Sequence, residues 1–191
     1  RRGDFAVVGA LQHNFKTGFT LNLFRHFCQY NKPYLFDKTK KPMMLHISAE
    51  DSATNNTLKL YQYLKENETK EPCDVTVFDP EEVGRYVQAK LTETGFHVHM
   101  LRINPTEFTY RDFYDIVLEF ESRGYEIHAC VFDYLNMISK RGCDQGATGA
   151  DIRNLFHRIR NFTLPRGITF ITPHQISSDA KKLLRSGVQP E

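Results

Sequence analysis

The sequence has little net charge, no apolar run of membrane-spanning length and no closely paired cysteines. Its formal charge is +2 over 191 residues. Without a strong positive field, contact with nucleic acid has to come from local clusters of lysine and arginine. No stretch is long and apolar enough to cross a bilayer, and no signal-peptide pattern is visible, so we expect no membrane contact.

The four cysteines are far apart in the sequence, and none belongs to a C-x-x-C pair. They are Cys28, Cys73, Cys130 and Cys143. This spacing argues against a zinc site and against a disulfide framework. Cys130 lies inside an apolar run and is predicted to be a core residue. Free thiols in a domain of ordinary size fit a reducing, cytoplasmic setting.

The composition is that of a globular domain, with 40% hydrophobic and 25% charged residues. The length suits one large domain spanning residues 1–191. The chain does not begin with methionine, and its last residues show no structural closure. We therefore expect a fragment of a longer polypeptide.

Strand and helix patterns alternate along the chain. Apolar strands are predicted over residues 4–10, 43–49, 96–103, 127–135 and 167–175, and the first and last of these are expected to be buried. Helical spacing or helix-start signals fall at residues 16–30, 55–68, 80–95, 109–124 and 150–162. This alternation predicts an α/β fold with a parallel sheet covered by helices on both faces.

The segment after the first strand lacks the glycines of a phosphate-binding loop. Lys16 and Thr17 stand at a strand-to-helix turn, as in the pattern G-x-x-x-x-G-K-[ST]. However, Ala10 and Phe15 occupy the two glycine positions, and Gly9 is one place early. Taken alone, this segment favours an ordinary strand-turn-helix that happens to contain a lysine.

Polar residues at the ends of three other predicted strands change that interpretation. Asp133, Glu50 and Gln175 each follow an apolar run. Singly, each has a simpler explanation: many strands end in an acid, acids favour helix N-termini, and a glutamine can be a solvated strand end. In a parallel sheet, though, these ends and Lys16 would meet at one edge, where α/β sheets bind ligands. Together they favour a nucleotide site.

In this order of segments the chain resembles the RecA-like motor domain of DnaB-type replicative helicases. The similar stretches are RRGDFAVVGALQHNFKTGFTLNLF, HISAED, VFDYLNMI and ITPHQISSDA, which together span nearly the whole chain. The resemblance implies a RecA-like P-loop NTPase fold, a mostly parallel twisted sheet with helices on both faces. It also implies ATP, or another nucleoside triphosphate, and Mg²⁺ as cofactors.

The resemblance also assigns roles to residues. Lys16 would bind the β- and γ-phosphates, Thr17 and Asp133 would hold Mg²⁺, Glu50 would be the general base, and Gln175 would couple the γ-phosphate to DNA binding. The nucleotide-binding loop would comprise Gly9, His13, Asn14, Phe15, Lys16, Thr17 and Gly18.

The loop departs from the family pattern at two positions. His13 and Phe15 stand where the family usually has glycines. A side chain forced into left-handed backbone geometry costs about 1–2 kcal/mol, although Asn14 tolerates it better. Since some phage recombinases related to RecA place a bulky residue before this lysine, we expect a shifted loop, weaker nucleotide binding and a phage-like source. The setting would then be a bacterial or phage-infected cell.

By the same resemblance, single-stranded DNA would lie on loops that follow two of the strands, at residues 139–149 and 176–187. Their basic residues are Lys140, Arg141, Lys181, Lys182 and Arg185. Such contacts would be independent of base sequence, whereas the simpler alternative is that these side chains are only solvated. The full-length protein would form a hexameric ring, with primase as a further partner.

No segment after Gln175 matches the family's arginine finger, so the isolated chain should hydrolyse ATP poorly. Two other functions remain open at this stage. One is a RecA-type strand-exchange recombinase, which would form filaments and joint molecules. The other is a relative that binds nucleotide or partners without turnover.

Overall fold

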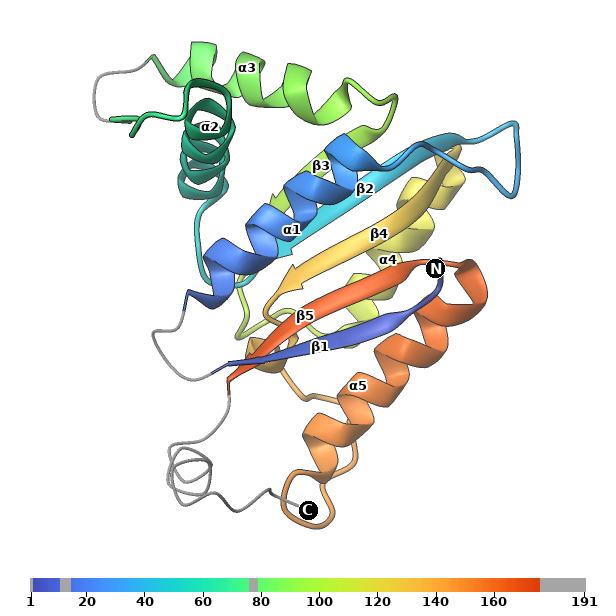
Figure 1. Cartoon of the computed structure of the whole chain (residues 1–191). Coiled ribbons are helices and arrows are strands. Elements are labelled where there is room, and N and C mark those ends of the chain that lie inside the picture. The colour runs from blue at the N-terminus through green and yellow to red at the C-terminus, as the bar shows by residue number, and fades with distance from the viewer. Residues whose placement is uncertain (1, 11–14, 76–78, 176–191) are drawn as a thin grey trace, which may run out of the picture.

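The structure of the chain is a computed structural model that describes residues 2–10, 15–75 and 79–175. Its five strands form one parallel sheet in the order β1-β5-β4-β2-β3 (Figure 1). The strands are β1 (Phe5–Ala10), β2 (Lys41–Ser48), β3 (His97–Arg102), β4 (Tyr125–Asp133) and β5 (Thr169–Gln175). The predicted α/β class and parallel sheet are confirmed.

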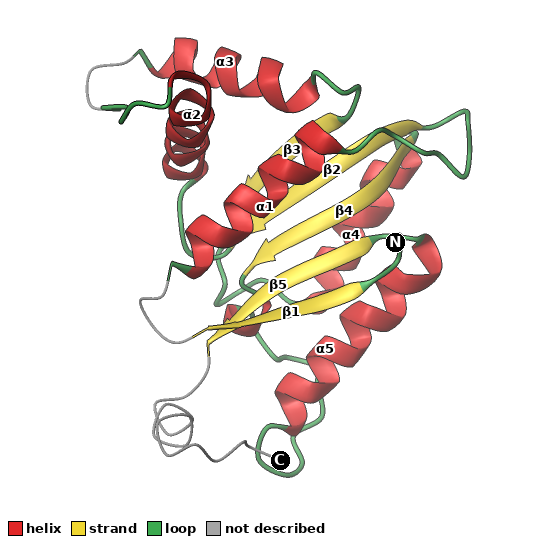
Figure 2. Ribbon diagram, in the orientation of Figure 1, coloured by secondary structure: helices red, strands yellow, loops and turns green. Residues whose placement is uncertain are grey.

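Five α-helices cover both faces of this sheet, as the sequence predicts (Figure 2). They are α1 (Lys16–Tyr30), α2 (Ala53–Thr69), α3 (Pro80–Thr92), α4 (Tyr110–Ser122) and α5 (Ala150–Thr163), with short 3-10 helices η1 (Leu135–Met137) and η2 (Leu164–Arg166). Their starts follow local chemistry. Asp79 caps α3 just before Pro80, and Thr109 with Asp112 forms a capping box on α4.

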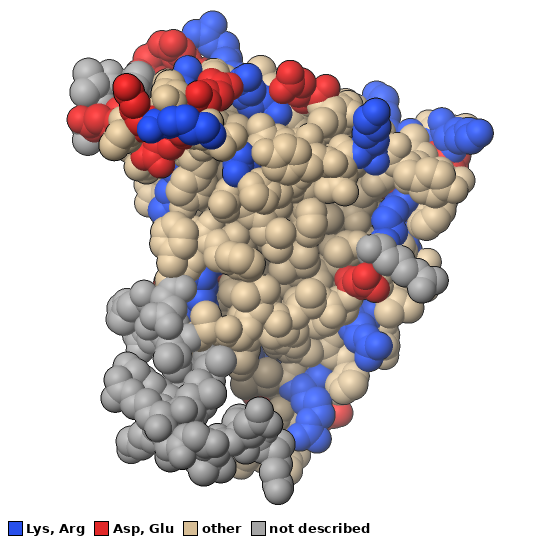
Figure 3. All heavy atoms as spheres, in the orientation of Figure 1, with Lys and Arg blue, Asp and Glu red and all other residues tan. Residues whose placement is uncertain are grey.

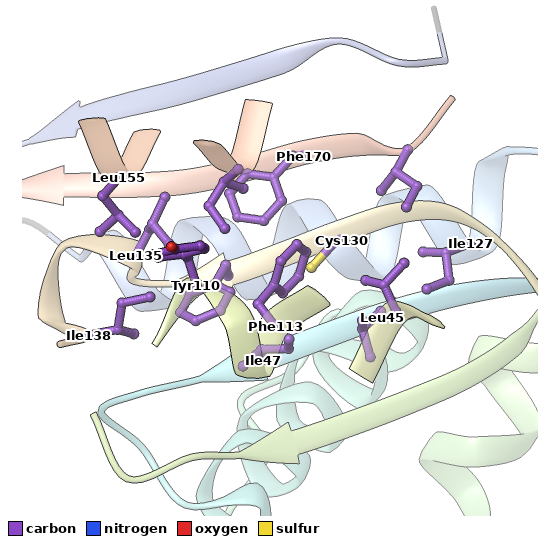
Figure 4. Packing of buried hydrophobic residues seen from close by; sticks show 14 of the residues in the cluster. Leu45, Ile47, Tyr110, Phe113, Ile127, Cys130, Leu135, Ile138, Leu155 and Phe170 are labelled. Atoms are coloured by element: carbon purple, nitrogen blue, oxygen red, sulfur yellow. The ribbon is translucent and has the colours of Figure 1, made fainter. Parts of the chain in front are cut away.

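Two apolar clusters hold the layers together, one on each face of the sheet. On one face, α1, α2 and α3 pack on the sheet through residues such as Phe24, Leu60 and Val87. On the other, α4 and α5 pack through Phe113 and Leu155 (Figure 4). Burying side chains of this size contributes about 1.5–3 kcal/mol each, which explains why the central strands are almost wholly apolar.

The strand order decides which strands are buried. The central strand β4 is buried from Glu126 to Asp133, and β2 from Met43 to Ser48. β1 lies at an edge of the described sheet, and its Ala6, Val7 and Gly9 are exposed. The prediction that the first strand is buried is therefore wrong, because hydropathy reports composition and not position in the sheet. For the last strand, β5, the same prediction is confirmed.

No helix among the described residues is both long enough and apolar enough to cross a membrane.

A buried histidine makes the fold sensitive to acid. His46 of β2 is fully enclosed, edge-on to Phe24 at 5.3 Å between ring centres, and neither ring nitrogen has a hydrogen-bond partner among the described residues. Burial lowers the pKa of His46 to about 4. The unfolded chain therefore binds a proton more readily than the folded chain between about pH 6.5 and 4, and stability falls as the pH falls through that window.

Replacing His46 with leucine should remove this sensitivity. Relative to wild type, His46→Leu is expected to gain about 2 kcal/mol more unfolding free energy at pH 5 than at pH 7.5. Urea denaturation at the two pH values measures the difference. His128, whose pKa burial also lowers to about 4, keeps the variant partly acid-sensitive, so the comparison is made between the two proteins. A parallel pH dependence in both would contradict the assignment.

Candidate nucleotide-binding site

The carboxyl ends of the strands meet at one edge of the sheet, where α1 also begins (Figure 1). In the parallel register Ala10 lies opposite Gln175, and Ser48 lies opposite Asp133. The Ala49 N–H donates to the Asp133 carbonyl at 2.7 Å. The four strand ends singled out by the sequence thus lie along this edge, as expected from parallel pairing.

Asp133 is the most unusual residue at this edge. It is fully buried at the end of β4, and the peptide bond to Tyr134 is cis. Neither carboxylate oxygen has a hydrogen-bond partner of good geometry among the described residues. Burial raises the pKa of Asp133 to about 6, the nearby Thr17 hydroxyl opposes this, and the charge of Glu50 adds to it. A buried carboxylate without a compensating donor is costly, which indicates that the site suits a cation.

The oxygen atoms at this point fit Mg²⁺. Asp133 offers two buried carboxylate oxygens, and the Thr17 hydroxyl from the first turn of α1 lies close enough to influence them. Mg²⁺ prefers oxygen ligands and commonly uses one or two side chains, with waters and substrate phosphates completing its shell. No group of three or more His, Cys, Asp or Glu side chains suited to a metal occurs in the described ranges. A site with few protein ligands is therefore the kind that the residues support.

Two acidic residues follow β2, and they differ in their surroundings. Asp51 forms an ion pair with Lys59 of α2 at 2.5 Å, and its N–H donates to the Ser48 hydroxyl at 3.0 Å. Glu50 is exposed, and no described side chain forms a hydrogen bond or ion pair with it. Of the two carboxylates, Glu50 is therefore the one available to a water molecule or a ligand.

The first turn of α1 is arranged as an anion site. α1 begins at Lys16, and Phe15 provides no side-chain cap for its first N–H groups. Uncapped N–H groups and the helix dipole together favour a negative ligand such as phosphate. Phe15 has φ 51° and ψ 33°, the left-handed geometry that its place in the loop implied. His13 and Asn14 lie outside the described residues.

The ring of Phe15 folds back onto the helix that it precedes. Gly18 is buried, and a Cβ at this position would overlap the ring tip of Phe15. The ring also meets Tyr63 of α2 edge-on, at 6.5 Å between centres. Gly18 therefore provides the space that the bulky side chain needs, a role that the sequence pattern did not reveal.

The loop of residues 139–149 is anchored at several points. The Ser139 N–H donates to the Phe108 carbonyl at 2.9 Å, and Cys143 is buried. The Lys140 ammonium donates to the Asn136 carbonyl, and burial lowers its pKa. Arg141 is exposed. Of the two basic residues expected here to contact DNA, Arg141 is the more accessible. The other three, Lys181, Lys182 and Arg185, lie outside the described residues.

Sequence reasoning missed two residues that shape this edge. Lys59 pairs with Asp51 and lowers the pKa of Asp133, but it comes from the second turn of α2, where no motif marks it. Thr172 of β5 accepts a hydrogen bond from the Leu135 N–H at 2.9 Å, which ties β5 to the segment just after Asp133. A buried threonine within an apolar strand was the only signal for it.

The fold and this site define a RecA-like α/β domain of the ATPase type. The chain belongs to the divergent DnaB-like ATPase family, whose model matches residues 1–189. No curated protein matches the chain in sequence.

Two solved structures have a similar fold. One is a DnaB-like replicative helicase, determined with its interactions with primase, and the other is the ATPase domain of a second protein. Their sequence identities to the chain are 10% and 9%, and their TM-scores are 0.65 and 0.66. Each match covers 95% of this chain but only 42% and 61%, respectively, of the other chain. At such low identity, the likeness concerns the fold.

The contact between Phe15 and Gly18 should appear as strong energetic coupling. Gly18→Ala alone is expected to destabilise the chain by about 1–3 kcal/mol, because the added methyl displaces the ring. In a Phe15→Gly background the same change should stabilise it by roughly 0.5–1 kcal/mol, because alanine favours a helix. Urea denaturation of the four proteins measures this cycle. Additive effects, within about 0.5 kcal/mol, would show that the ring does not rest on Gly18.

Asp133 gives the site a pH dependence opposite to that of His46. Because its folded-state pKa is raised, the ionised carboxylate destabilises the fold, and stability falls as pH rises from about 4 to about 6. Asp133→Asn lacks this loss and should gain about 2 kcal/mol more over wild type at pH 7.5 than at pH 4.5. Added Mg²⁺ should stabilise wild type at pH 7.5 but not the variant. Equal Mg²⁺ effects on the two proteins would argue against Asp133 as a ligand.

Proposed function

We propose that this chain is the ATP-driven motor domain of a DNA helicase that moves along single-stranded DNA. One observation carries the proposal: a buried, unpaired Asp133 carboxylate lies beside the Thr17 hydroxyl, at the uncapped first turn of a helix. This combination puts cation-binding oxygens next to an anion-binding helix end. A nucleoside triphosphate with Mg²⁺ has both charges.

The roles of the chain's own residues follow from their positions. The N–H groups of the first turn of α1 and the Lys16 ammonium would bind the phosphates, and the Thr17 and Asp133 oxygens would hold Mg²⁺. When bound, Mg²⁺ neutralises charge on the phosphates during transfer. No described side chain is paired with Glu50, so its carboxylate can accept a proton from the attacking water.

Gln175 is suited to sensing the nucleotide. It pairs in register with Ala10, the last residue of β1 before the phosphate loop. Its neutral amide can form a hydrogen bond to a terminal phosphate without adding charge. β5 is also tied to the segment after Asp133 through Thr172. A shift of β5 would therefore reach both the metal side of the site and the chain that follows Gln175.

DNA contact in this proposal belongs to the loop of residues 139–149, with Lys140 and Arg141, and to Lys181, Lys182 and Arg185 beyond β5. Assembly as a hexameric ring would let a neighbour supply the missing arginine, and primase is a candidate partner. These parts of the proposal draw on the family and on the proteins of similar fold. A bacterial or phage-infected cytoplasm is the setting that they suggest.

A relative without turnover is the strongest competing function, and Phe15 favours it. A bulky residue at φ 51° in the phosphate loop costs free energy that a glycine would not. A strand-exchange recombinase remains the second competitor, since it would use the same core.

Nucleotide binding is tested with a fluorescent, non-hydrolysable ATP analogue in the presence of Mg²⁺. Lys16→Ala should weaken binding by about 10- to 100-fold, the effect of losing a hydrogen bond from a charged donor to phosphate. The matched control, Lys32→Ala, loses the same charge at an exposed position just beyond the other end of α1 and should bind as wild type does. Equal affinities for all three proteins would exclude a phosphate site at Lys16.

Turnover separates the competing functions. Glu50→Gln should bind the analogue normally, yet abolish ATP hydrolysis by the assembled full-length protein. Duplex unwinding by that assembly supports the helicase, and joint-molecule formation supports the recombinase. Binding without hydrolysis in wild type, unchanged by Glu50→Gln, would identify a relative that does not turn over.

A further inference from the structure

Exposed aromatic side chains gather at the amino edge of the sheet, opposite the candidate nucleotide site. They are Tyr30, the last residue of α1, and Tyr34 and Phe36 in the loop of residues 31–40 that joins α1 to β2, here called the α1–β2 loop. Their exposed fractions are 70%, 69% and 64%. Such a group of exposed rings on one loop marks an interaction surface more often than a solitary ring does.

Lysines surround these rings. Lys32 and Lys38 are exposed within the α1–β2 loop, Lys40 is half-buried, and Lys41 is exposed at the start of β2. The one acid of the loop, Asp37, accepts hydrogen bonds from the Thr39 N–H and hydroxyl, at 3.0 and 2.7 Å. In Figure 3, Lys and Arg side chains stand along the edge of the molecule where this loop projects, whereas the centre of the face is largely uncharged.

A half-buried ion pair holds the α1–β2 loop in place. The Arg2 guanidinium lies 2.5 Å from the Glu126 carboxylate and also donates to the Tyr34 carbonyl at 2.7 Å. Glu126 in turn accepts from the Phe36 and Asp37 N–H groups, each at 3.0 Å. The loop backbone is therefore fixed from both sides, and its aromatic rings are presented with little entropy left to lose on binding.

The two loop rings have a defined arrangement. Tyr34 and Phe36 stand perpendicular at 6.0 Å between centres, and the Arg2 guanidinium covers one face of Phe36 at 4.2 Å. Phe36 also rests on Gly167, where a Cβ would come within 2.5 Å of the ring. Large parts of both rings nevertheless remain open to a ligand.

We propose that the α1–β2 loop binds single-stranded nucleic acid, with bases stacking on Tyr34 and Phe36 and phosphates contacting Lys32 and Lys38. Aromatic platforms flanked by cations bind single strands without sequence preference, since every base offers a flat face and every linkage a charge. An acidic protein segment would satisfy the lysines but would leave the rings without a stacking partner. The combination of rings and lysines thus favours the nucleic acid.

This surface is separate from the loops expected to hold DNA in the motor. The nine residues of β4 run from one edge of the sheet to the other, a length of about 30 Å. Residues 139–149 follow its carboxyl end, whereas the α1–β2 loop lies at its amino end, where the Lys41 N–H donates to the Gly124 carbonyl at 2.8 Å. A strand bound at one edge would have to be several nucleotides long to reach the other.

Fluorescence anisotropy with a labelled oligothymidylate of about 20 nucleotides tests the proposal on the whole chain, without nucleotide or Mg²⁺. Tyr34→Ala should weaken binding about tenfold, whereas Tyr34→Phe, which keeps the ring, should bind as wild type does. Leu118→Ala removes an accessible apolar side chain from α4 and should have no effect. The Tyr34 side chain is mostly exposed, so these variants are expected to fold.

The charge contribution is measured from the salt dependence of binding. Lys38→Gln should lower the slope of log affinity against log salt by about 0.7, the value for one phosphate contact on a single strand. Lys70→Gln makes the same charge change at the far end of α2 and should leave the slope unaltered.

Three results would overturn the proposal. These are equal affinities for Tyr34→Ala and Tyr34→Phe, equal salt slopes for Lys38→Gln and Lys70→Gln, or competition by polyglutamate as effective as that by unlabelled DNA. The last result would mean that charge alone is recognised. Arg141→Ala reports on the loop after β4, so its effect bears on the proposed motor function and not on this surface.

Discussion

The parallel pairing of β4 with β2 and β5 is the constraint on which the candidate site depends. Because all three strands run the same way, Ser48, Asp133 and the end of β5 reach one edge together. Their central position also buries Asp133, which an edge strand would have left in water. Topology thus sets both the location and the electrostatic character of the site. The raised pKa of Asp133 is a consequence of sheet order, with the nearby acids adding to it.

Much of this could be predicted from the sequence, for a physical reason. Parallel strands bring their carboxyl ends together whatever their order in the sheet, so Glu50, Asp133 and Gln175 could be grouped without knowing that order. The exposure of β1 could not be predicted, because strand order depends on pairings between distant segments. The ion pair between Lys59 and Asp51 was likewise hidden, since it depends on how α2 leaves the sheet. The space at Gly18 depends on the direction of a neighbouring ring.

The two edges of the sheet use charge in different ways. At the carboxyl edge the acids Glu50, Asp51 and Asp133 crowd together, and only Lys59 is recorded as an ion-pair partner among them. At the amino edge Glu126 is satisfied by Arg2 and by backbone N–H groups, and burial, its largest opposing influence, does not prevent a lowered pKa. The first arrangement stores unfavourable electrostatic energy that a cation would relieve. The second fixes a loop whose exposed lysines form no ion pair with a described acid, which suits recognition of an anionic polymer.

The glycine-poor loop is best understood as a pair of linked departures from the usual pattern. A glycine before Lys16 would take left-handed geometry without strain, whereas Phe15 takes it at a cost and also needs space for its ring. Gly18 provides that space inside the first turn of α1, at the further cost of a weak helix former there. The ring contacts with Gly18 and Tyr63 return part of the free energy through burial of apolar surface. These contacts lie on the helix and leave the first N–H groups of α1 uncapped, so the feature that binds an anion is retained although the glycines are gone.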